Sequence, residues 1–433
     1  MKNFVRCMAL LLTVLTVLSG CGGGVPAGTT AGHGNADAPE EAAFEPKLDT
    51  TMAVKLDAAV FFGNFEAFDQ VINQFNEYYP NVTIEYERYS DTMAEDFLTT
   101  NSNIDVLMTS NERGYPTKNC VDLLAAGVDV SAADDNIIAA NKRGGVLYAL
   151  PMSLYLKGLV VNKTLLAKEG LTVPQTYAEF IGVLDALKQK GYTPIQGPNA
   201  AVSSLFYDMG MSMMANDTAL YKAAEAGDAA GAAALKTVYT RLGEFIDKGY
   251  IDTAVNATYP DDNYDGAILR FFEGEVPFWV CDTEKASGMK KRESKSEAFT
   301  ASPIDYEFMY APLGEGGAYK YIEPWYGFAV NKNSDVADYA VEFLRFMARG
   351  DALNTLASVK GVPSIAKVTS DAKYDNLGST KTELSAVNDG TVSPFCGTLL
   401  MRAAEALLNG TEPDADGAFT LFLTSCKEIE WDY

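Results

Sequence analysis

The spacing of apolar and polar residues between positions 56 and 108 predicts a repeated strand–helix unit. Residues 56–62 form a short apolar run that is typical of a buried strand. Apolar side chains then recur at helical spacing over residues 68–79, and a proline follows them. Residues 82–86 alternate as in a strand, a short helix is expected near 93–98, and residues 104–108 form a third apolar strand. The order β-α-β-α-β predicts a parallel sheet with right-handed crossovers.

Ligands of such sheets bind at the carboxyl ends of the strands, which points to two loops. Gly63, Asn64 and Phe65 follow the first predicted strand, and residues 110–115 follow the third. We expect Asn64 to face a ligand cleft; the alternative is a turn residue beside Gly63.

Further helices are predicted later in the chain by their end signals. Thr176 and Glu179 have the spacing of a capping box at the start of an amphipathic helix. Ser334 can cap another helix, which Gly350 would close. Residues 223–235 are rich in alanine, which has a high helix propensity. The α/β pattern therefore continues through the chain.

The first 21 residues resemble a bacterial lipoprotein signal. Two basic residues precede an apolar run at 8–18 that is too short to span a bilayer. The segment LSGC at 18–21 resembles a lipobox, in which the peptide before the Cys is removed and the Cys carries lipid. This implies a signal peptide at residues 1–20 and a lipid anchor on Cys21; an ordinary signal peptide or a coincidental Cys is the alternative. Residues 21–48 predict a flexible tether because they are rich in Gly, Ala, Thr, Pro and acidic residues.

The chain is strongly acidic, with 34 Lys and Arg against 58 Asp and Glu and a formal net charge of −24. An acidic surface repels phosphate backbones, so no nucleic-acid partner is expected. The basic run Lys290, Lys291 and Arg292 is an exception. We expect it to be a solvated loop, and a docking contact for a membrane partner is the alternative. No second apolar run is long enough to span a membrane, so the chain after Cys21 is expected at the outer face of the cell membrane.

The single histidine, His33, lies in the predicted tether, so the folded part has no imidazole. This excludes Ser-His-Asp and Cys-His catalysis, and we expect no metal and no cofactor, although paired carboxylates stay possible. Cys7 is lost with the signal peptide and Cys21 carries the lipid. Four cysteines remain, at Cys120, Cys281, Cys396 and Cys426. None of their spacings is that of a CxxC motif, and the three possible disulfide pairings stay open.

Seven groups of residues carry a resemblance to a known family. They are FNEYYPNV at 75–82, IDVL at 104–107, LYALP at 147–151 with GLVVNK at 158–163, LTVPQTY at 171–177, FEGEVPFW at 272–279, GFAVNKNS at 327–334 with AVEFL at 340–344, and GVP at 361–363. Their order and spacing resemble the family 1 extracellular solute-binding proteins of ABC importers, the group that includes maltose-binding protein. The resemblance extends over nearly the whole mature chain.

The resemblance implies a two-lobed α/β fold of the type II periplasmic-binding-protein kind, with a hinge that lets the lobes close on a ligand. It places lobe 1 at residues 49–152 plus 324–366 and lobe 2 at residues 153–323 plus 367–433. The chain would cross between lobes near residues 151–158, near 323 and near 363–368.

A sugar site needs aromatic rings for the apolar faces of the sugar, and carboxylates, amides and arginines for its hydroxyls. The resemblance places Glu112 and Arg113 in the loop where maltodextrin-binding members carry an acidic–basic pair. The alternative is an exposed ion pair worth at most about 1 kcal/mol. The resemblance also implies cleft positions for Tyr155, Phe206, Tyr207 with the adjacent Asp208, Trp279 with the nearby Asp282, Trp325 and Tyr326. Core packing is the alternative for Phe206 and Tyr207, and Trp431 is expected to pack.

The expected function is that of a lipid-anchored monomer, not an enzyme, that captures a sugar or oligosaccharide and delivers it to ABC permease subunits in the membrane. One alternative is the same fold binding a peptide, a polyamine or another cation, which the acidic composition favours mildly. Another is an extracellular carbohydrate-active enzyme that uses two carboxylates. A sensory receptor of this fold is the third.

Overall fold

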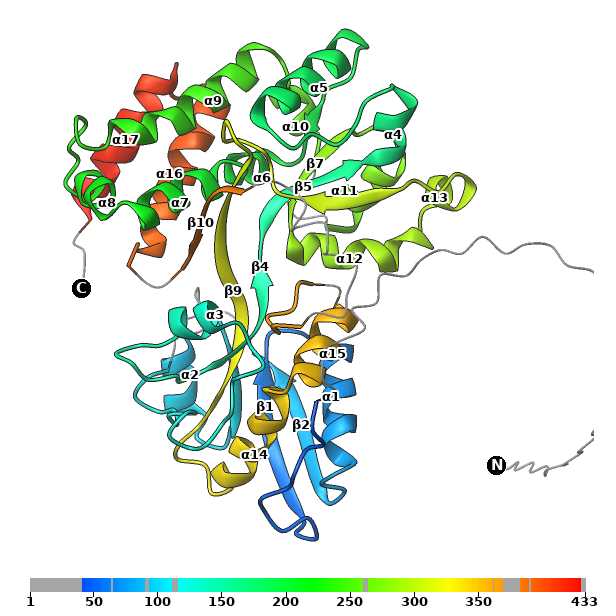
Figure 1. Cartoon of the computed structure of the whole chain (residues 1–433), viewed down its shortest axis with the longest axis vertical. Helices are drawn as coiled ribbons and strands as arrows, with labels where there is room; N and C mark the ends of the chain where they lie inside the picture. The colour runs from blue at the N-terminus through cyan, green and yellow to red at the C-terminus, as the bar shows by residue number, and fades with distance from the viewer. Residues whose placement is uncertain are drawn as a thin grey trace, which may run out of the picture. The chain divides into compact units, whose positions relative to one another are not determined.

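The computed structural model (Figure 1) describes residues 41–429, apart from residues 64, 90–92, 111–115, 260–263, 361, 369–381 and 389–390. Several predictions lie outside the described residues, namely those on the signal peptide, Cys21, most of the tether, His33, Asn64, Glu112, Arg113 and Trp431. Within the described part of the chain, no helix combines the length and the apolar character needed to cross a membrane.

The predicted parallel strands form one side of a six-stranded sheet with the order β10-β9-β3-β1-β2, in which β4 also pairs with β9. The strands are β1 (Val54–Val60), β2 (Val82–Arg88), β3 (Val106–Thr109), β4 (Leu150–Tyr155), β9 (Ala318–Val330) and β10 (Thr382–Val387). Strand β1 is parallel to β2 and β3, whereas β9 is antiparallel to β3 and β4. The β-α-β-α-β prediction is therefore confirmed, and the three later strands β4, β9 and β10 complete the sheet.

A second sheet of four strands has the order β6-β7-β5-β8. Its strands are β5 (Lys157–Asn162), β6 (Ile195–Gln196), β7 (Phe278–Asp282) and β8 (Tyr306–Met309). Strand β5 is antiparallel to β7 and β8, while β6 is parallel to β7. Both sheets are thus mixed, and Figure 1 shows helices packed around each.

The described helices are α1 (Glu66–Asn76), α2 (Ala94–Thr100), α3 (Asp135–Ala140), α4 (Lys163–Lys168), α5 (Tyr177–Gln189), α6 (Asn199–Ser204), α7 (Tyr207–Asn216), α8 (Thr218–Glu225), α9 (Lys236–Asp247), α10 (Thr253–Asn256), α11 (Tyr264–Phe272), α12 (Thr283–Glu293), α13 (Glu297–Ala301), α14 (Ala337–Met347), α15 (Gly350–Lys360), α16 (Pro394–Leu408) and α17 (Ala415–Glu428). A 3-10 turn covers Ala233–Leu235.

The predicted starts and ends of the later helices are only partly confirmed. Thr176 and Glu179 form the predicted capping box at the start of α5. The Ser334 hydroxyl accepts a hydrogen bond from the Val336 amide at 3.0 Å before α14 begins. The role expected of Gly350 was wrong, because it opens α15 and does not close α14. The alanine-rich helix ends at Glu225, since a turn with Gly227 at φ 67° interrupts it.

The basic run Lys290, Lys291 and Arg292 is not the solvated loop that we expected. It forms the last turn of α12, where cations interact favourably with the carboxyl end of the helix. Each cation also has a carboxylate partner, which is Glu293, Glu66 and Asp265 respectively.

Each sheet has its own hydrophobic core, which confirms the predicted two-lobed α/β fold. In the first core the rings of Phe68 and Phe328 stack at 5.0 Å between centroids. The core of the second sheet contains Tyr321 from the early part of β9, whereas Phe328 lies later on the same strand. Strand β9 therefore runs from one core to the other, and Figure 1 shows β4 beside it. The residue-level lobe boundaries given above stay a prediction.

Candidate functional site

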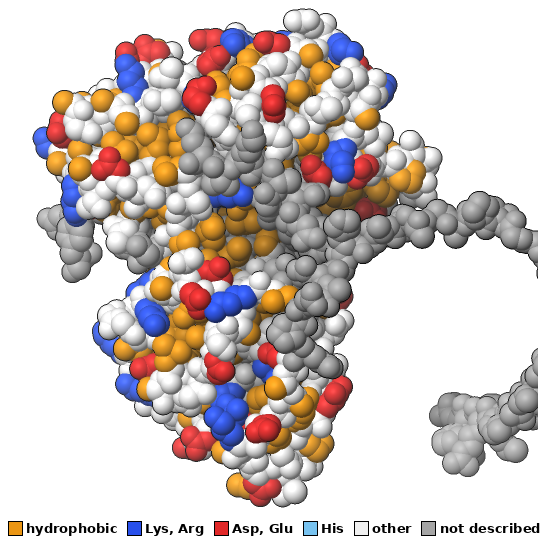
Figure 2. Space-filling model, viewed as in Figure 1, with side chains coloured by type: hydrophobic (Ala, Val, Ile, Leu, Met, Phe, Trp, Pro, Cys, Tyr) orange, Lys and Arg blue, Asp and Glu red, His pale blue; other side chains and the backbone are white. Residues whose placement is uncertain are grey.

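A cavity of about 680 Å³ lies where the crossing strands β4 and β9 meet both lobes. Its volume lies in the range usual for small-molecule sites. Figure 2 shows hydrophobic side chains gathered at this level, over β4 and β9 of Figure 1. The lining residues are Phe61, Phe62, Arg88, Ser110, Tyr155, Lys157, Pro198, Ala201, Ser204, Tyr207, Cys281, Asp282, Glu284, Lys285, Glu323, Pro324, Trp325, Thr398 and Met401.

One wall of the cavity is aromatic. The half-buried Trp325 ring lies 5.7 Å from the Phe62 ring and 6.4 Å from the Tyr155 ring, between centroids. Phe61 and Phe62 directly follow β1, so they lie at the carboxyl end of a parallel strand, where the pattern predicts a ligand. Aromatic faces of this kind provide flat apolar surfaces against which a ligand can stack.

Next to the Tyr155 ring, whose centre lies 4.7 Å from Lys157 Nζ, the cavity contains a nearly buried ion pair. Lys157 Nζ lies 3.0 Å from Glu323 Oε2, and the two side chains are only 12% and 11% exposed. Glu323 Oε1 accepts further hydrogen bonds from the Tyr207 hydroxyl at 3.1 Å and from Asn388 Nδ2 at 3.2 Å. Lys157 Nζ also lies 3.7 Å from the centre of the Tyr207 ring. These contacts connect the start of β5 to β9 and α7.

Asp282 ends β7 and begins α12, so it lies at a strand end in the second lobe. Its Oδ1 accepts from the Lys285 amide at 2.9 Å, while Oδ2 accepts from the Tyr155 hydroxyl at 3.0 Å and from Lys285 Nζ at 2.7 Å. Burial lowers the pKa of Lys285, but the charge of Asp282 and its hydrogen bond outweigh burial and raise that pKa above the ordinary value. Lys285 is therefore protonated at neutral pH.

Asp208 lies directly behind this site and does not line the cavity. It is buried on α7, and its Oδ2 has no hydrogen-bond partner. Desolvation is the largest cause that raises the pKa of Asp208 to about 8; Lys157 opposes the shift and Glu323 adds to it. Asp208 is therefore largely protonated at neutral pH.

Helix α16 packs closely on the site through a glycine. A Cβ atom on Gly397 would lie 2.4 Å from Cε2 of the Tyr207 ring, closer than real side chains approach. The absence of a side chain at Gly397 therefore lets α16 press against Tyr207, and Thr398 and Met401 of the same helix line the cavity.

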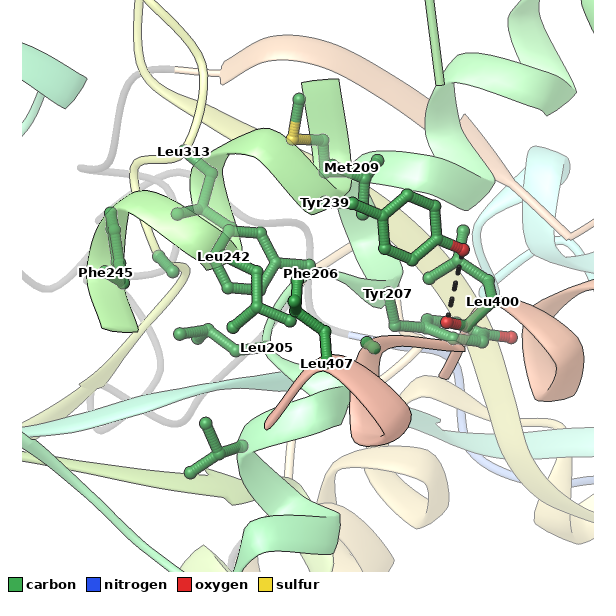
Figure 3. Close-up of a cluster of buried hydrophobic side chains, with 14 of the residues drawn as sticks. Leu205, Phe206, Tyr207, Met209, Tyr239, Leu242, Phe245, Leu313, Leu400 and Leu407 are labelled. Atoms are coloured by element: carbon green, nitrogen blue, oxygen red, sulfur yellow. Dashed lines mark hydrogen bonds between the residues drawn. The ribbon is translucent and has the colours of Figure 1, made fainter. Parts of the chain in front are cut away.

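The structure brings four of the predicted site residues together at the cavity: Tyr155, Tyr207, Asp282 and Trp325. It does not bring Phe206, Trp279 or Tyr326 there, because each is buried in a core with at most 1% of its surface exposed. Figure 3 shows Phe206 among Leu205, Leu242 and Phe245. The Trp279 ring packs against the Phe271 ring, with 6.0 Å between centroids. Tyr326 points away from the cavity because side chains alternate along β9.

Sequence reasoning missed several lining residues. Phe61 and Phe62 were assigned to a buried strand, although an aromatic pair just before Gly63 could have indicated the strand end. Lys157 and Glu323 are 166 positions apart, and neither has a local signal. Among the described residues, no group of three or more His, Cys, Asp or Glu side chains could hold a metal ion.

Residues 62–352 match a family model described as bacterial extracellular solute-binding protein. No curated protein matches the chain.

Solved structures also resemble this one. The sugar-binding protein MalE from Xanthomonas citri is 16% identical with a TM-score of 0.67, and the match covers 86% of this chain and 96% of that one. A sugar transporter from Bacillus licheniformis in complex with stachyose is 18% identical with a TM-score of 0.62, covering 86% and 98%. Maltose-bound MalE3 of T. maritima is 17% identical with a TM-score of 0.61, covering 87% and 99%. At such identities the likeness establishes the fold.

Proposed function

The chain belongs to the bacterial extracellular solute-binding protein family, whose members are not enzymes, and we propose on that premise that it captures a sugar or short oligosaccharide for an ABC importer. The observation that carries this proposal is the aromatic wall formed by Trp325, Tyr155 and Phe62, beside charged and hydrogen-bonding groups of the same cavity. Sugars have apolar C–H faces and polar edges, and this arrangement matches both. The lobes would close on the ligand about β4 and β9 and present it to the permease.

The names of the similar proteins support a carbohydrate. Three of them bear the words sugar-binding, stachyose and maltose. Within the cavity Tyr155, Tyr207, Asp282 and Trp325 are the proposed contacts carried over from the sequence, and Asn64, Glu112 and Arg113 stay proposed contacts from loops outside the described residues.

A cationic cargo such as a polyamine is the second candidate, and the charges of the cavity count against it. The lining has three carboxylates, at Asp282, Glu284 and Glu323, and three cations, at Arg88, Lys157 and Lys285. Lys157 and Lys285 already neutralise two of the carboxylates. A binding site for a cation would need a surplus of negative charge, so a neutral polar ligand fits better.

Thermal unfolding of the unlipidated mature chain in the presence of sugars, peptides and polyamines tests the proposal. A ligand at a hundred times its Kd stabilises the fold by about 2.7 kcal/mol. We expect one sugar series to raise the Tm, and Trp325→Ala to remove the increase. Tyr339→Ala is the matched control, because this half-buried ring on α14 does not line the cavity. A Tm increase with polyamines or peptides alone would move the cargo to the second candidate.

We also propose that lipid on Cys21 anchors the protein to the outer face of the cell membrane. Expression of Cys21→Ala with an intact signal region tests this. The variant is expected in the medium and the unaltered chain in the membrane fraction, while membrane retention of both would refute the anchor.

A further inference from the structure

Helices α16 and α17 form a hairpin that carries two cysteines at its open end. The two helices are joined by residues 409–414 and pack together in the second core. Cys396 lies 12 residues before the last residue of α16, Leu408, and Cys426 lies 11 residues after the first residue of α17, Ala415. Residues nearly equally far from the turn of an antiparallel hairpin lie at the same level along it, so the two cysteines lie on neighbouring turns of the paired helices.

The contacts of the two thiols agree with this register. Both side chains are fully buried. The Cys396 thiol donates to the Met214 thioether at 3.6 Å, and it also shares a hydrogen bond with the Cys426 thiol. That hydrogen bond, together with burial, raises the pKa of Cys396 above its ordinary range.

The other two cysteines lie in hydrophobic clusters that contain neither Cys396 nor Cys426. Cys120 belongs to a cluster beside the first sheet, and Cys281 lies on β7 in a separate cluster. Of the three pairings that the sequence leaves open, any that includes Cys396–Cys120 or Cys396–Cys281 would have to join different clusters. Only Cys396 and Cys426 share a core among the described cysteines.

We propose that Cys396 and Cys426 form a disulfide when the chain folds outside the cell, and that this bond holds the open end of the α16–α17 hairpin together. The thiolate of one cysteine attacks an oxidant disulfide, from a small molecule or a protein, and releases one thiol. The second thiolate then attacks the mixed disulfide and releases the other thiol. The cysteines lose two protons and two electrons, which the oxidant accepts.

Oxidation must take place before folding is complete. In the folded chain both thiols are buried, and the raised pKa keeps the Cys396 thiol protonated, so an oxidant reaches no reactive thiolate. Extracellular proteins fold in an oxidising environment, where the unfolded chain exposes both groups.

The bond would also support the ligand site, a consequence that rests on the proposed function. Gly397 follows Cys396 directly and packs against the Tyr207 ring, and Thr398 lines the cavity. Fixing the first turn of α16 therefore fixes one wall of the site.

The first test uses the unaltered mature chain, refolded with a mixture of oxidised and reduced glutathione. The product is denatured and alkylated without reduction, and its peptides are identified by mass spectrometry. We expect Cys396 and Cys426 in one linked peptide pair, and Cys120 and Cys281 alkylated. Alkylation of both Cys396 and Cys426, or a link from either of them to another cysteine, would overturn the proposal, whether or not a sugar binds.

The second test measures thermal unfolding with and without a reductant. Closing a loop of about 30 residues is expected to raise the Tm by several degrees, so reduction should lower it by that amount. Cys396→Ala should show no effect of the reductant, whereas the control Cys120→Ala should respond like the unaltered chain. An equal response of Cys396→Ala would contradict the assignment.

Discussion

Two ion pairs in this protein have nearly the same length and very different surroundings. Lys157 and Glu323 lie 3.0 Å apart with 12% and 11% of their side chains exposed. Lys291 and Glu66 lie 2.8 Å apart and join α12 of one lobe to α1 of the other, with 60% and 53% exposed. Distance alone would rank the pairs as equal, but the solvent around them changes the strength of each interaction.

The two ion pairs differ in what can solvate the remaining charge when one partner is removed. Water can solvate Lys291 if Glu66 is removed, so the exposed pair can break at little cost. The carboxylate oxygens of Glu323 accept hydrogen bonds from Lys157, Tyr207 and Asn388, and little water reaches them. Removal of that carboxylate leaves a buried ammonium and a buried hydroxyl without their acceptor.

The largest expected effect is that of Glu323→Ala. Loss of one partner of a buried ion pair costs about 3–5 kcal/mol of unfolding free energy, which urea denaturation measures. Glu66→Ala is the matched control and should cost at most about 1 kcal/mol. The double replacement Lys157→Met with Glu323→Leu should recover much of the loss. Equal losses of unfolding free energy for Glu323→Ala and Glu66→Ala would show that burial does not strengthen the Lys157–Glu323 pair.

A smaller, pH-dependent effect is expected of Asp208→Asn, beside the buried pair. The pKa of Asp208 is about 8 in the folded chain, against an ordinary value of 3.8. The unfolded chain therefore loses this proton first, and the stability that the proton contributes falls as the pH rises from about 4 to about 8. Asn cannot ionise, so the variant should gain stability relative to the unaltered chain over that range, by up to a few kcal/mol.

Urea denaturation of Asp208→Asn at pH 5 and at pH 8 measures this effect. Asp265→Asn is a suitable control, because Arg292 lowers the pKa of the partly exposed Asp265. A difference between Asp208→Asn and the unaltered chain that does not change with pH would show that Asp208 is ionised in the folded protein.

The smallest effect is expected of Lys291→Ala. The exposed contact to Glu66 should contribute at most about 1 kcal/mol, and less in about 1 M salt, where screening acts over about 3 Å. Unfolding of the variant and the unaltered chain at low and high salt measures this. A loss above about 2 kcal/mol would mean that the contact between α1 and α12 is more important to the fold than its exposure suggests.

The elements that the sequence predicted well are those with local causes. The strand–helix order around β1, β2 and β3 follows from apolar spacing, and the capping box of α5 lies within four residues. The ion pair of Lys157 and Glu323 could not be predicted, because the partners are 166 positions apart and meet only when β9 is in place.

Neighbouring aromatic residues show a second limit of the sequence. Trp325 lines the cavity and Tyr326 is in the core, although both are large rings that follow one another between a proline and a glycine. Strand β9 is largely buried on both faces, so no polar alternation marks which ring faces the ligand. Trp279 on β7 is ambiguous for the same reason, since every residue of that strand is buried.

The position of β9 in the chain also governs the order in which the protein can be made. The first sheet places β9 between β10 and β3, yet β3 ends at Thr109 and β9 begins at Ala318. During synthesis β3 therefore keeps an open edge until the whole second sheet has been translated. The first lobe cannot complete its fold early, and a chain destined for export would reach the membrane before it becomes too compact to be threaded across.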